Sequence, residues 1–450
     1  VMLYRKIESA VKRNLENPDS KVLVVSGARQ IGKSYIIRHT GSRLFKNLIE
    51  INLIEDFEGP RIFQNVRTTD DFYLSLSSIA GDRMGNNKDT LVFLDEIQQY
   101  PHLLTLIKFL KAENRFRYAI SGSLLGVTLK ATTSIPLGSI EIHQMYPIDF
   151  EEFLIANGFG IEAINSLRCH FNERKSLSSS MHEKLLSLFK RYLFVGGMPD
   201  AVNTYLETHN IMEIRKVQDN IHTLYGIGAS KYDEENRLKI KRIYDLVPSN
   251  MENKKKRLVF NEIEHKKGKR ASDYVEEIDY LVSSGITIEV KAISNPKFPL
   301  IETEAKNLLK LYLNDPGILS GILYQNNIKP VLDDIPSINL GSLYECAVAC
   351  ELASLGKRLF YYDNKSKGEV DFLIDDFQNL DVLPIEVKSG KDYKRHAALD
   401  RFVNIPDYNI KEGIVLSNDG KIESVGKILY LPIYFCMFLN GSGNPESLFI

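Results

Sequence analysis

Gly27-Ala28-Arg29-Gln30-Ile31-Gly32-Lys33-Ser34 matches the pattern G-x-x-x-x-G-K-[ST], and this stretch decides the fold. The apolar run Val22-Leu-Val-Val25 before it predicts a buried strand, and the residues from Tyr35 onward predict a helix. A loop between such a strand and helix turns backbone N–H groups toward one anion, and the helix N-terminus adds positive potential. We therefore expect the eight residues to hold a nucleotide, with Lys33 at the β- and γ-phosphates and Ser34 on Mg²⁺. The alternative is a chance match in a glycine-containing turn, which the order of strand, loop and helix disfavours.

Length and composition are those of an ordinary globular protein with several domains. The chain has 450 residues, of which 44% are apolar and 26% charged, and this length suggests about three domains. The net charge of -1 provides no overall field toward nucleic acid or membranes. Any such attraction must therefore be local.

Neither the cysteines nor the apolar runs indicate an oxidising compartment or a membrane. The cysteines show no ligand-type spacing with histidines, and the second and third, four residues apart on an expected helix, predict core packing. They are Cys169, Cys346, Cys350 and Cys436. No N-terminal signal segment is expected, and the longest apolar run, Ile428–Leu439, is too short to span a bilayer. We therefore expect a cytoplasmic protein without membrane contact.

The first half of the chain divides into two predicted regions. Residues 1–150 alternate apolar strands with helices, which predicts a parallel sheet covered on both faces. Residues 151–235 carry apolar side chains at helical spacing, interrupted at Gly196-Gly-Met-Pro199. The strands expected in the first region are Lys21–Val25, Leu48–Asn52, Leu91–Leu94, Tyr118–Ser121 and Ile140–Met145.

The second half also divides into two predicted regions. Residues 236–335 combine amphipathic helices with a hairpin of Thr287–Val290 and a partner strand near Pro299–Glu302. Residues 336–450 begin with a helix and continue as strands, which predicts a second α/β unit. The strands expected there are Leu359–Tyr362, Glu369–Ile374, Val382–Val387, Glu412–Leu416 and Ile428–Tyr434.

A carboxylate pair follows the third predicted strand of the first region. Nucleotide hydrolysis needs a carboxylate that holds the metal and a group that orients water. The strand Leu91-Val-Phe-Leu94 ends in Asp95-Glu96, at the edge where ligands bind in open α/β sheets. Asp95 would hold Mg²⁺, directly or through water, and Glu96 would be the general base. The alternative, a strand capped by a solvated acidic pair, is weakened by the phosphate loop upstream.

Small hydroxyl side chains end the next predicted strand, in Ser121-Gly122-Ser123. If the strand order is 5-1-4-3-2, this strand lies between the phosphate-loop strand and the strand that ends in Asp95. A polar side chain there senses the γ-phosphate, so Ser121 is the expected catalytic residue and Ser123 the second choice. The alternative is a turn without a catalytic role.

These motifs together resemble a prokaryotic branch of the AAA-type ATPases. The resemblance rests on the Gly-Ala-Arg-Gln lead into the loop, Leu-Asp-Glu-Ile-Gln, the Ser-Gly-Ser strand end and Tyr146-Pro-Ile-Asp-Phe-Glu-Glu-Phe. It implies a P-loop NTPase core over residues 1–150 and a helical lid over 151–235 that contains the Gly-Gly-Met-Pro break. It also implies ATP and Mg²⁺ as cofactors.

The chain departs from that family at one position. Members usually carry a Gly-Arg pair before the last strand of the sheet, whereas this chain has Gly138-Ser139. If that arginine completes a neighbouring subunit's site, its loss removes the sequence argument for an oligomer and puts fast hydrolysis in doubt. Arg115 and Arg117 are candidate substitutes.

Acidic and basic residues recur in the last region. Glu345 lies in its opening helix, Asp371 in a strand beside Glu369, and Glu386 and Lys388 share a face of another strand. Such a set can hold Mg²⁺ and activate water for attack on a phosphodiester. The plain alternative is a solvated strand face.

The C-terminal motifs resemble the uncharacterised domain that accompanies these ATPases, which is itself similar to the PD-(D/E)xK nuclease fold. The motifs are Gly341-Ser-Leu-Tyr-Glu345, Gly368-Glu-Val-Asp371-Phe-Leu and Pro384-Ile-Glu386-Val-Lys388. The resemblance implies a nuclease-like domain over residues 336–450 with Glu345, Asp371, Glu386 and Lys388 at its core positions. Domains of this kind often bind without cutting.

A basic segment at 254–270 is the sharpest local change in composition. Lys254-Lys-Lys-Arg257 and the lysines and arginine of 266–270 flank Leu258–Glu264, and the helices and hairpin around them resemble a winged-helix module. Such a segment would bind DNA phosphates with little sequence preference. A solvated or disordered basic loop, or a winged helix that contacts protein, is the alternative.

Three functions remain open at this point. The first is an ATP-driven switch or motor coupled to nucleic acid through the C-terminal modules. The second is a Mg²⁺-dependent nuclease regulated by ATP. The third is a nucleotide-gated scaffold with slow turnover and no nuclease activity.

Overall fold

The structure is a computed structural model that describes residues 2–125, 138–231, 237–302, 307–335 and 337–439. Its chain divides into two compact units. The N-terminal unit is Arg5–Tyr146 with Ser283–Gly285. The C-terminal unit consists of the described residues within Val1–Tyr4, Pro147–Val282 and Ile286–Ile450. None of the helices in the described ranges is long and apolar enough to cross a membrane.

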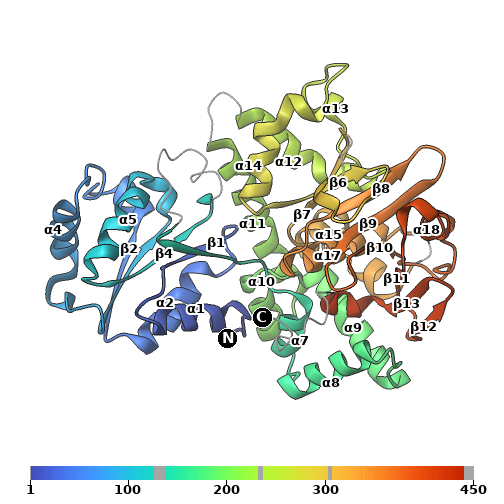
Figure 1. Cartoon of the computed structure of the whole chain (residues 1–450), viewed down its shortest axis with the longest axis horizontal. Coiled ribbons are helices and arrows are strands. Elements are labelled where there is room, and N and C mark those ends of the chain that lie inside the picture. Colours follow the sequence, from blue (N-terminus) through green and yellow to red (C-terminus); the bar gives the residue numbers. More distant parts are fainter. Residues whose placement is uncertain (1, 126–137, 232–236, 303–306, 336, 440–450) are drawn as a thin grey trace. The chain divides into compact units, whose positions relative to one another are not determined.

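The N-terminal unit is built on a five-stranded parallel sheet (Figure 1). Its strand order is β2-β3-β4-β1-β5, which confirms the predicted order and places the Ser121 strand between the other two. The strands are β1 (Val22–Ser26), β2 (Asn47–Asn52), β3 (Thr90–Asp95), β4 (Arg117–Gly122) and β5 (Ile140–Gln144). The helices are α1 (Ile7–Glu16), α2 (Lys33–Leu44), α3 (Leu53–Glu58), α4 (Thr69–Ala80) and α5 (His102–Glu113), with 3-10 turns η1 (Gly81–Arg83) and η2 (Ile97–Gln99).

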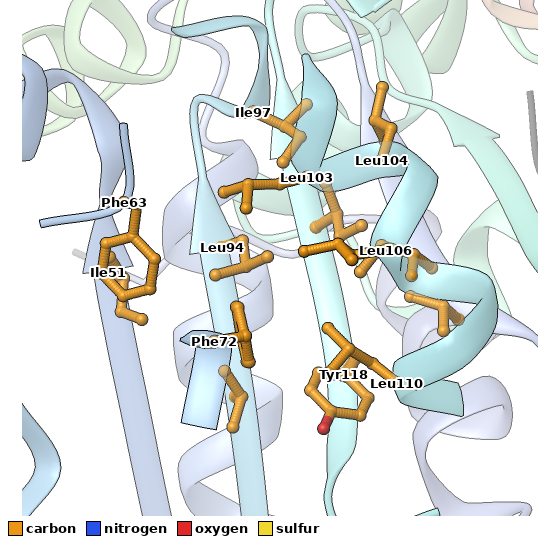
Figure 2. Close-up of a cluster of buried hydrophobic side chains, with 14 of the residues drawn as sticks. Ile51, Phe63, Phe72, Leu94, Ile97, Leu103, Leu104, Leu106, Leu110 and Tyr118 are labelled. Carbon is orange, nitrogen blue, oxygen red and sulfur yellow. The ribbon is translucent and has the colours of Figure 1, made fainter. Parts of the chain in front are cut away.

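Apolar side chains hold this sheet against its helices. All residues of β1, β3 and β4 are buried, as expected for central strands of a parallel sheet with both faces covered. Figure 2 shows leucines of α5 packed beside Leu94 and Tyr118, with Phe63, Phe72 and Ile51 nearby. This packing fixes the carboxyl ends of the strands, where the polar motifs lie.

The C-terminal unit begins with helices, as the spacing predicts. These are α7 (Phe150–Ala156), α8 (Ile161–Asn172), α9 (Ser179–Val195), α10 (Pro199–Thr208), α11 (Ile211–Lys231), α12 (Arg237–Glu252), α13 (Phe260–Glu264) and α14 (Val275–Ser283), with the 3-10 turn η3 (Ala271–Tyr274). Asp149 begins α7 through a capping box with Glu152. The capping box explains why Asp-Phe-Glu-Glu opens a helix.

The Gly196-Gly-Met-Pro break separates α9 from α10 and is held by a buried carboxylate. Gly197 donates its N–H to Asp315 at 2.5 Å, and Asp315 also caps α15 (Pro316–Tyr324) through the N–H of Ile318 at 2.8 Å. A Cβ on Gly197 would lie 2.1 Å from the carbonyl oxygen of Ile148. The glycine pair therefore permits a close backbone approach that no larger residue allows.

An eight-stranded mixed sheet forms the rest of the C-terminal unit (Figure 1). Its order is β12-β13-β11-β10-β9-β8-β6-β7. The strands are β6 (Thr287–Ile293), β7 (Leu309–Leu313), β8 (Phe360–Asn364), β9 (Gly368–Asp376), β10 (Asp381–Val387), β11 (Gly413–Ser417), β12 (Glu423–Val425) and β13 (Ile428–Pro432). The remaining helices and turns are η4 (Leu300–Glu302), α15 (Pro316–Tyr324), α16 (Lys329–Leu332), α17 (Gly341–Ser354), α18 (Ala397–Val403), η5 (Pro406–Tyr408) and η6 (Ile433–Phe438).

The predicted hairpin partner of Thr287–Val290 is wrong. Strand β6 pairs antiparallel with β7, whereas Leu300–Glu302 is the 3-10 turn η4. Strand β6 also pairs in parallel with β8, so the expected wing is the edge of the C-terminal sheet. The predicted boundary between residues 335 and 336 therefore runs through one continuous sheet. A winged helix with a sheet of its own does not form from these strands.

Candidate active site

The loop after β1 curls into a shape that only glycine permits at its first position. Gly27 has φ +151, and a Cβ there would lie 2.3 Å from the carbonyl oxygen of Met145. Gly32 has φ 93 and immediately precedes α2, so the loop delivers its backbone directly to a helix N-terminus. This arrangement matches the anion-binding loop that the sequence predicts.

Arg5 holds this loop from outside, and its role was missed by the sequence analysis. One Nη donates to the carbonyl oxygen of Ile31 at 2.8 Å and the other to that of Tyr146 at 2.5 Å. Arg5 is buried, so these bonds replace its hydration. No motif marks this arginine, because its partners are backbone atoms that lie far away in sequence.

Lys33 lies inside the loop. Its Nζ donates to the carbonyl oxygen of Ala28 at 2.6 Å, and the residue is only 5% exposed. Burial lowers the pKa of Lys33, and the charges of Glu96 and Asp95 oppose that effect. Lys33 is therefore a buried cation held next to two carboxylates, at the place where a triphosphate would lie.

Asp95 joins the loop to the neighbouring strands. It accepts hydrogen bonds from Ser34 Oγ at 2.7 Å and from Ser121 Oγ. Burial raises the pKa of Asp95, while the bonds from Ser121 and Ser34 favour the charged form. The structure thus brings together Ser34, Asp95 and Ser121 from the ends of three neighbouring elements.

Glu96 heads a second network next to Asp95. Its backbone is left-handed, with φ 58, and its Oε2 accepts from Ser123 Oγ at 3.2 Å and from Gln98 Nε2. Gln98 Nε2 also donates to Ser123 Oγ, at 3.2 Å, and Arg29 Nε donates to the same oxygen at 3.3 Å. Ser123, the second choice of the sequence analysis, therefore contacts Glu96, whereas Ser121 contacts Asp95.

Gln98 is the other residue that sequence reasoning missed. It belongs to the Leu-Asp-Glu-Ile-Gln motif, and the turn η2 brings its amide back toward Glu96. The left-handed backbone at Glu96 makes this turn possible. A signal was present in the sequence, because Gln98 is the next polar side chain after the acidic pair.

The candidate substitutes for the missing arginine lie at the wrong end of the sheet. Arg117 is the first residue of β4, and its guanidinium donates to the carbonyl oxygens of Asn17 and Asn14. Arg115 stacks over the ring of Tyr73. Because β4 spans about 17 Å from Arg117 to Gly122 at ~3.3 Å per residue, neither side chain reaches the phosphate loop of its own chain. Arg29, inside the loop, does reach the Glu96 network.

A comparison with protein families identifies the part of the chain that carries this site. The family described as an AAA domain matches residues 19–154. Residues 19–154, which include most of the N-terminal unit, are therefore similar to an AAA domain. The five-stranded parallel sheet is that of a P-loop NTPase, and the fold implies ATP binding at the loop. The matched residues include the whole loop and both carboxylate networks.

Two further families match the rest of the chain. Both are described as domains of unknown function: DUF8612 matches residues 186–329 and DUF4143 matches residues 340–436. No curated protein matches the chain. Neither description assigns a function to the C-terminal unit.

Several solved structures are similar to this chain at low identity. The Walker-type ATPase paby2304 of Pyrococcus abyssi is 14% identical, over 71% of this chain and 95% of that chain, with a TM-score of 0.42. The Orc1 protein of Aeropyrum pernix in complex with DNA is 14% identical, over 75% and 94%, with a TM-score of 0.28. The RuvB Holliday junction branch migration motor of Thermotoga maritima is 13% identical, over 63% and 89%, with a TM-score of 0.31.

A second polar cluster lies in the C-terminal unit. Glu345 on α17, Asp371 on β9 and Glu386 on β10 come together, and Val387 donates its N–H to Asp371 Oδ2 at 2.8 Å. Burial raises the pKa of Asp371, and the nearby charges of Glu345 and Glu386 raise it further. The structure therefore gathers the carboxylates that the resemblance to nucleases implies.

Lysines pair with these carboxylates. Lys388 Nζ lies 2.8 Å from Glu386 Oε1, and Lys310 Nζ lies 2.7 Å from Glu369 Oε1. Glu345 accepts from Tyr312 at 2.9 Å and forms an ion pair with Lys256 at 2.8 Å. Among the described residues, no group of three or more histidine, cysteine, aspartate or glutamate side chains is arranged to hold a metal ion. In this conformation the cluster therefore does not fit Mg²⁺.

The basic segment that was expected to contact DNA is divided in the structure. Lys256 and Arg257 point into the C-terminal unit, where Arg257 pairs with Asp363 at 2.9 Å and approaches Glu369 at 3.8 Å. Lys269 lies over the ring of Tyr274. The remaining lysines of the segment are exposed: Lys254, Lys255, Lys266 and Lys267. Only part of the predicted DNA-binding surface is thus open to solvent.

Proposed function

We propose that this chain is a Mg²⁺-dependent ATPase that works as a nucleotide-driven switch. The observation that supports it most is that Ser34 and Ser121 both donate to Asp95, beside a buried Lys33. The Ser34 hydroxyl and the Asp95 carboxylate, whose oxygens lie 2.7 Å apart, are hard oxygen ligands of the kind that Mg²⁺ prefers, so these two residues would hold the ion. When bound, Mg²⁺ would neutralise charge on the phosphates.

Each group of the site has one role in this proposal. The Gly27–Ser34 backbone binds the phosphates, and Lys33 exchanges its bond to Ala28 for the β- and γ-phosphate oxygens. Glu96 accepts a proton from the attacking water, and Ser123 and Gln98 orient its carboxylate. Ser121 fixes Asp95 from the adjacent strand, and this contact transmits the state of the γ-phosphate to the sheet.

We propose that Arg29 replaces the arginine that members of the family usually carry at the position of Ser139. Its guanidinium already lies beside Ser123 and Glu96, on the side of the loop that faces the water-activating network. A cation there would stabilise charge on the transferring phosphoryl group. This proposal explains how the chain could turn over ATP without an arginine from a neighbour.

Substitution of Arg29 tests this role. Arg29→Ala is expected to lower kcat about 100-fold, the magnitude typical of one lost donor to a transition-state oxyanion, with a smaller effect on ATP affinity. Arg29→Lys should recover part of the rate, because it restores the charge but not the planar fork. The matched control is Arg43→Ala, an exposed arginine on α2. An unchanged kcat in Arg29→Ala would exclude the role.

We also propose that nucleic acid is the partner to which the switch responds. The support is local: four lysines of the basic segment stay exposed in a chain of net charge -1. Two exposed pairs, before and after α13, could contact successive phosphates of a duplex. The paired Lys256 and Arg257 are left out of this surface.

A fourfold substitution tests nucleic-acid binding. Replacement of Lys254, Lys255, Lys266 and Lys267 by alanine should weaken duplex DNA binding and reduce the slope of log affinity against log salt by about 0.9 per lost phosphate contact. Fluorescence anisotropy with labelled duplex at several salt concentrations measures both. The control replaces four exposed lysines of the N-terminal unit: Lys12, Lys46, Lys88 and Lys108. Equal losses in both variants would point to unspecific charge effects and reject the proposed surface.

A further inference from the structure

Four carboxylates and three ammonium groups meet in the C-terminal unit. The acids are Glu345, Glu369, Asp371 and Glu386, and the bases are Lys256, Lys310 and Lys388. Two of the acids are nearly inaccessible, since Glu345 is 3% and Glu386 7% exposed. Buried charges of this number persist only when each has a partner. The bases are therefore part of the cluster.

One carboxylate oxygen of the cluster accepts no hydrogen bond. Glu386 Oε1 accepts from Lys388, but Glu386 Oε2 is buried without a hydrogen-bond partner. A buried carboxylate oxygen in that state is costly and points to a cation contact that this conformation does not supply. It faces the same group of charges as Glu345 and Asp371, which act electrostatically on one another.

Lys256 differs from the other two lysines in where it comes from. Lys310 belongs to β7, and Lys388 directly follows β10, so both are fixed by the sheet. Lys256 comes from the short connection between α12 and α13, where its backbone is left-handed with φ 49. This connection delivers its ammonium to Glu345 at 2.8 Å, in the field of Asp371.

The connection is held by short-range bonds, among them those from the N–H of Lys256 to the carbonyl oxygen of Asn253 at 3.0 Å and from the N–H of Asn253 to that of Asn250 at 3.2 Å. Leu258 donates its N–H to the carbonyl oxygen of Leu309 at 3.0 Å, and Val259 donates to Asn250 Oδ1 at 2.8 Å. Arg257 adds its ion pair with Asp363. On the other side of Lys256, residues Asn253, Lys254 and Lys255 are exposed. Lys256 could therefore leave the cluster through a local movement of this connection, without unfolding of the sheet.

We infer that Lys256 is an internal cation that takes the place of a divalent metal ion between Glu345, Asp371 and Glu386, so that this site binds metal only after Lys256 withdraws. The pairing of Glu345, a carboxylate that suits a hard metal ion, with an ammonium group is then explained by one side chain. The inference holds whether or not the N-terminal site hydrolyses ATP.

Metal binding by a Lys256 variant tests the inference. Mn²⁺ is titrated into the full chain without nucleotide, and bound metal is counted from the loss of the free-ion electron paramagnetic resonance signal. Lys256→Met keeps the apolar stem and removes the charge. It is expected to bind one Mn²⁺ at least about tenfold more tightly than the wild type, because the competing cation is gone. The matched control, Lys255→Met, changes an exposed neighbour and should behave as the wild type.

Two results would overturn it. The first is equal Mn²⁺ affinity in the wild type and in Lys256→Met. The second is tight binding in Lys256→Met that survives an added Glu386→Gln, because the metal would then lie elsewhere.

An independent measurement on the wild type covers the case of a misfolded variant. Mn²⁺ should raise the rate of amine acetylation at Lys256 severalfold but leave Lys255 unchanged, as read by peptide mass spectrometry, and no change at Lys256 would also reject the inference.

Discussion

Lys33→Ala is expected to abolish ATP hydrolysis and to weaken ATP binding at least about 100-fold. A charge-assisted contact to two phosphates contributes about 3 kcal/mol or more, and tenfold in affinity corresponds to about 1.4 kcal/mol. The side chain is buried and already lies inside the loop, so little of this contribution is lost to ordering the lysine. We therefore expect the loss of this one ammonium group to weaken ATP binding and to stop hydrolysis.

Binding of a fluorescent ATP analogue and release of phosphate measure the two effects. Lys108→Ala serves as the control, since Lys108 is exposed on α5 of the same unit. Melting curves show whether the variants remain folded. A Lys33→Ala protein with wild-type affinity and turnover would place the nucleotide elsewhere.

Glu96→Gln is expected to separate binding from hydrolysis. Loss of a general base slows the chemical step by about 10²–10⁴-fold, whereas the phosphate contacts of the loop do not involve Glu96. The amide oxygen of the substituted side chain can still accept from Ser123 and Gln98, so the local geometry should persist. The variant should therefore bind ATP like the wild type and fail to release phosphate.

Single-turnover hydrolysis of radiolabelled ATP checks this expectation. Glu113→Gln, at the exposed end of α5, is the matched control. Wild-type hydrolysis in Glu96→Gln would show that another group activates water. Loss of both binding and hydrolysis would show that Glu96 has a structural role instead.

The N-terminal unit was largely predictable because its signals are local. A buried strand ends where polar residues begin, so the positions of Asp95 and Ser121 along the chain already mark the same edge of the sheet. Because β3 and β4 are parallel neighbours, the two residues lie at the same edge, and in the structure Ser121 donates a hydrogen bond to Asp95. Arg5 could not be predicted, since its partners are backbone carbonyls without a sequence pattern.

The C-terminal unit was less predictable because its pairings are distant. Strand β6 pairs with β7 across an intervening 3-10 turn, and the alternation of apolar residues near β6 does not choose between two candidate partners. Lys310 lies in β7 at 1% exposure, although a lysine in a strand usually marks a solvated face. Its ion pair with the partly buried Glu369, on a strand distant in sequence, explains this position.

Lys256 shows the same limit in a charged segment. A run of three lysines and an arginine predicts a solvated, phosphate-binding surface by composition alone. In the structure Lys254 and Lys255 are exposed to solvent. Lys256 and Arg257 instead form ion pairs with buried carboxylates on α17 and β8. The charge of a segment shows that it attracts negatively charged groups, but it does not show whether those groups belong to the same protein or to a partner.

One measurement tests the central claim most directly. Phosphate release from ATP is followed with the full wild-type chain over a range of Mg²⁺ concentrations, with Lys33→Ala as the blank. We expect a rate above the blank that rises with Mg²⁺, saturates, and disappears when EDTA removes the metal. A wild-type rate equal to that of Lys33→Ala at every Mg²⁺ concentration would contradict the assignment of an ATP-hydrolysing site to the loop at Gly27–Ser34.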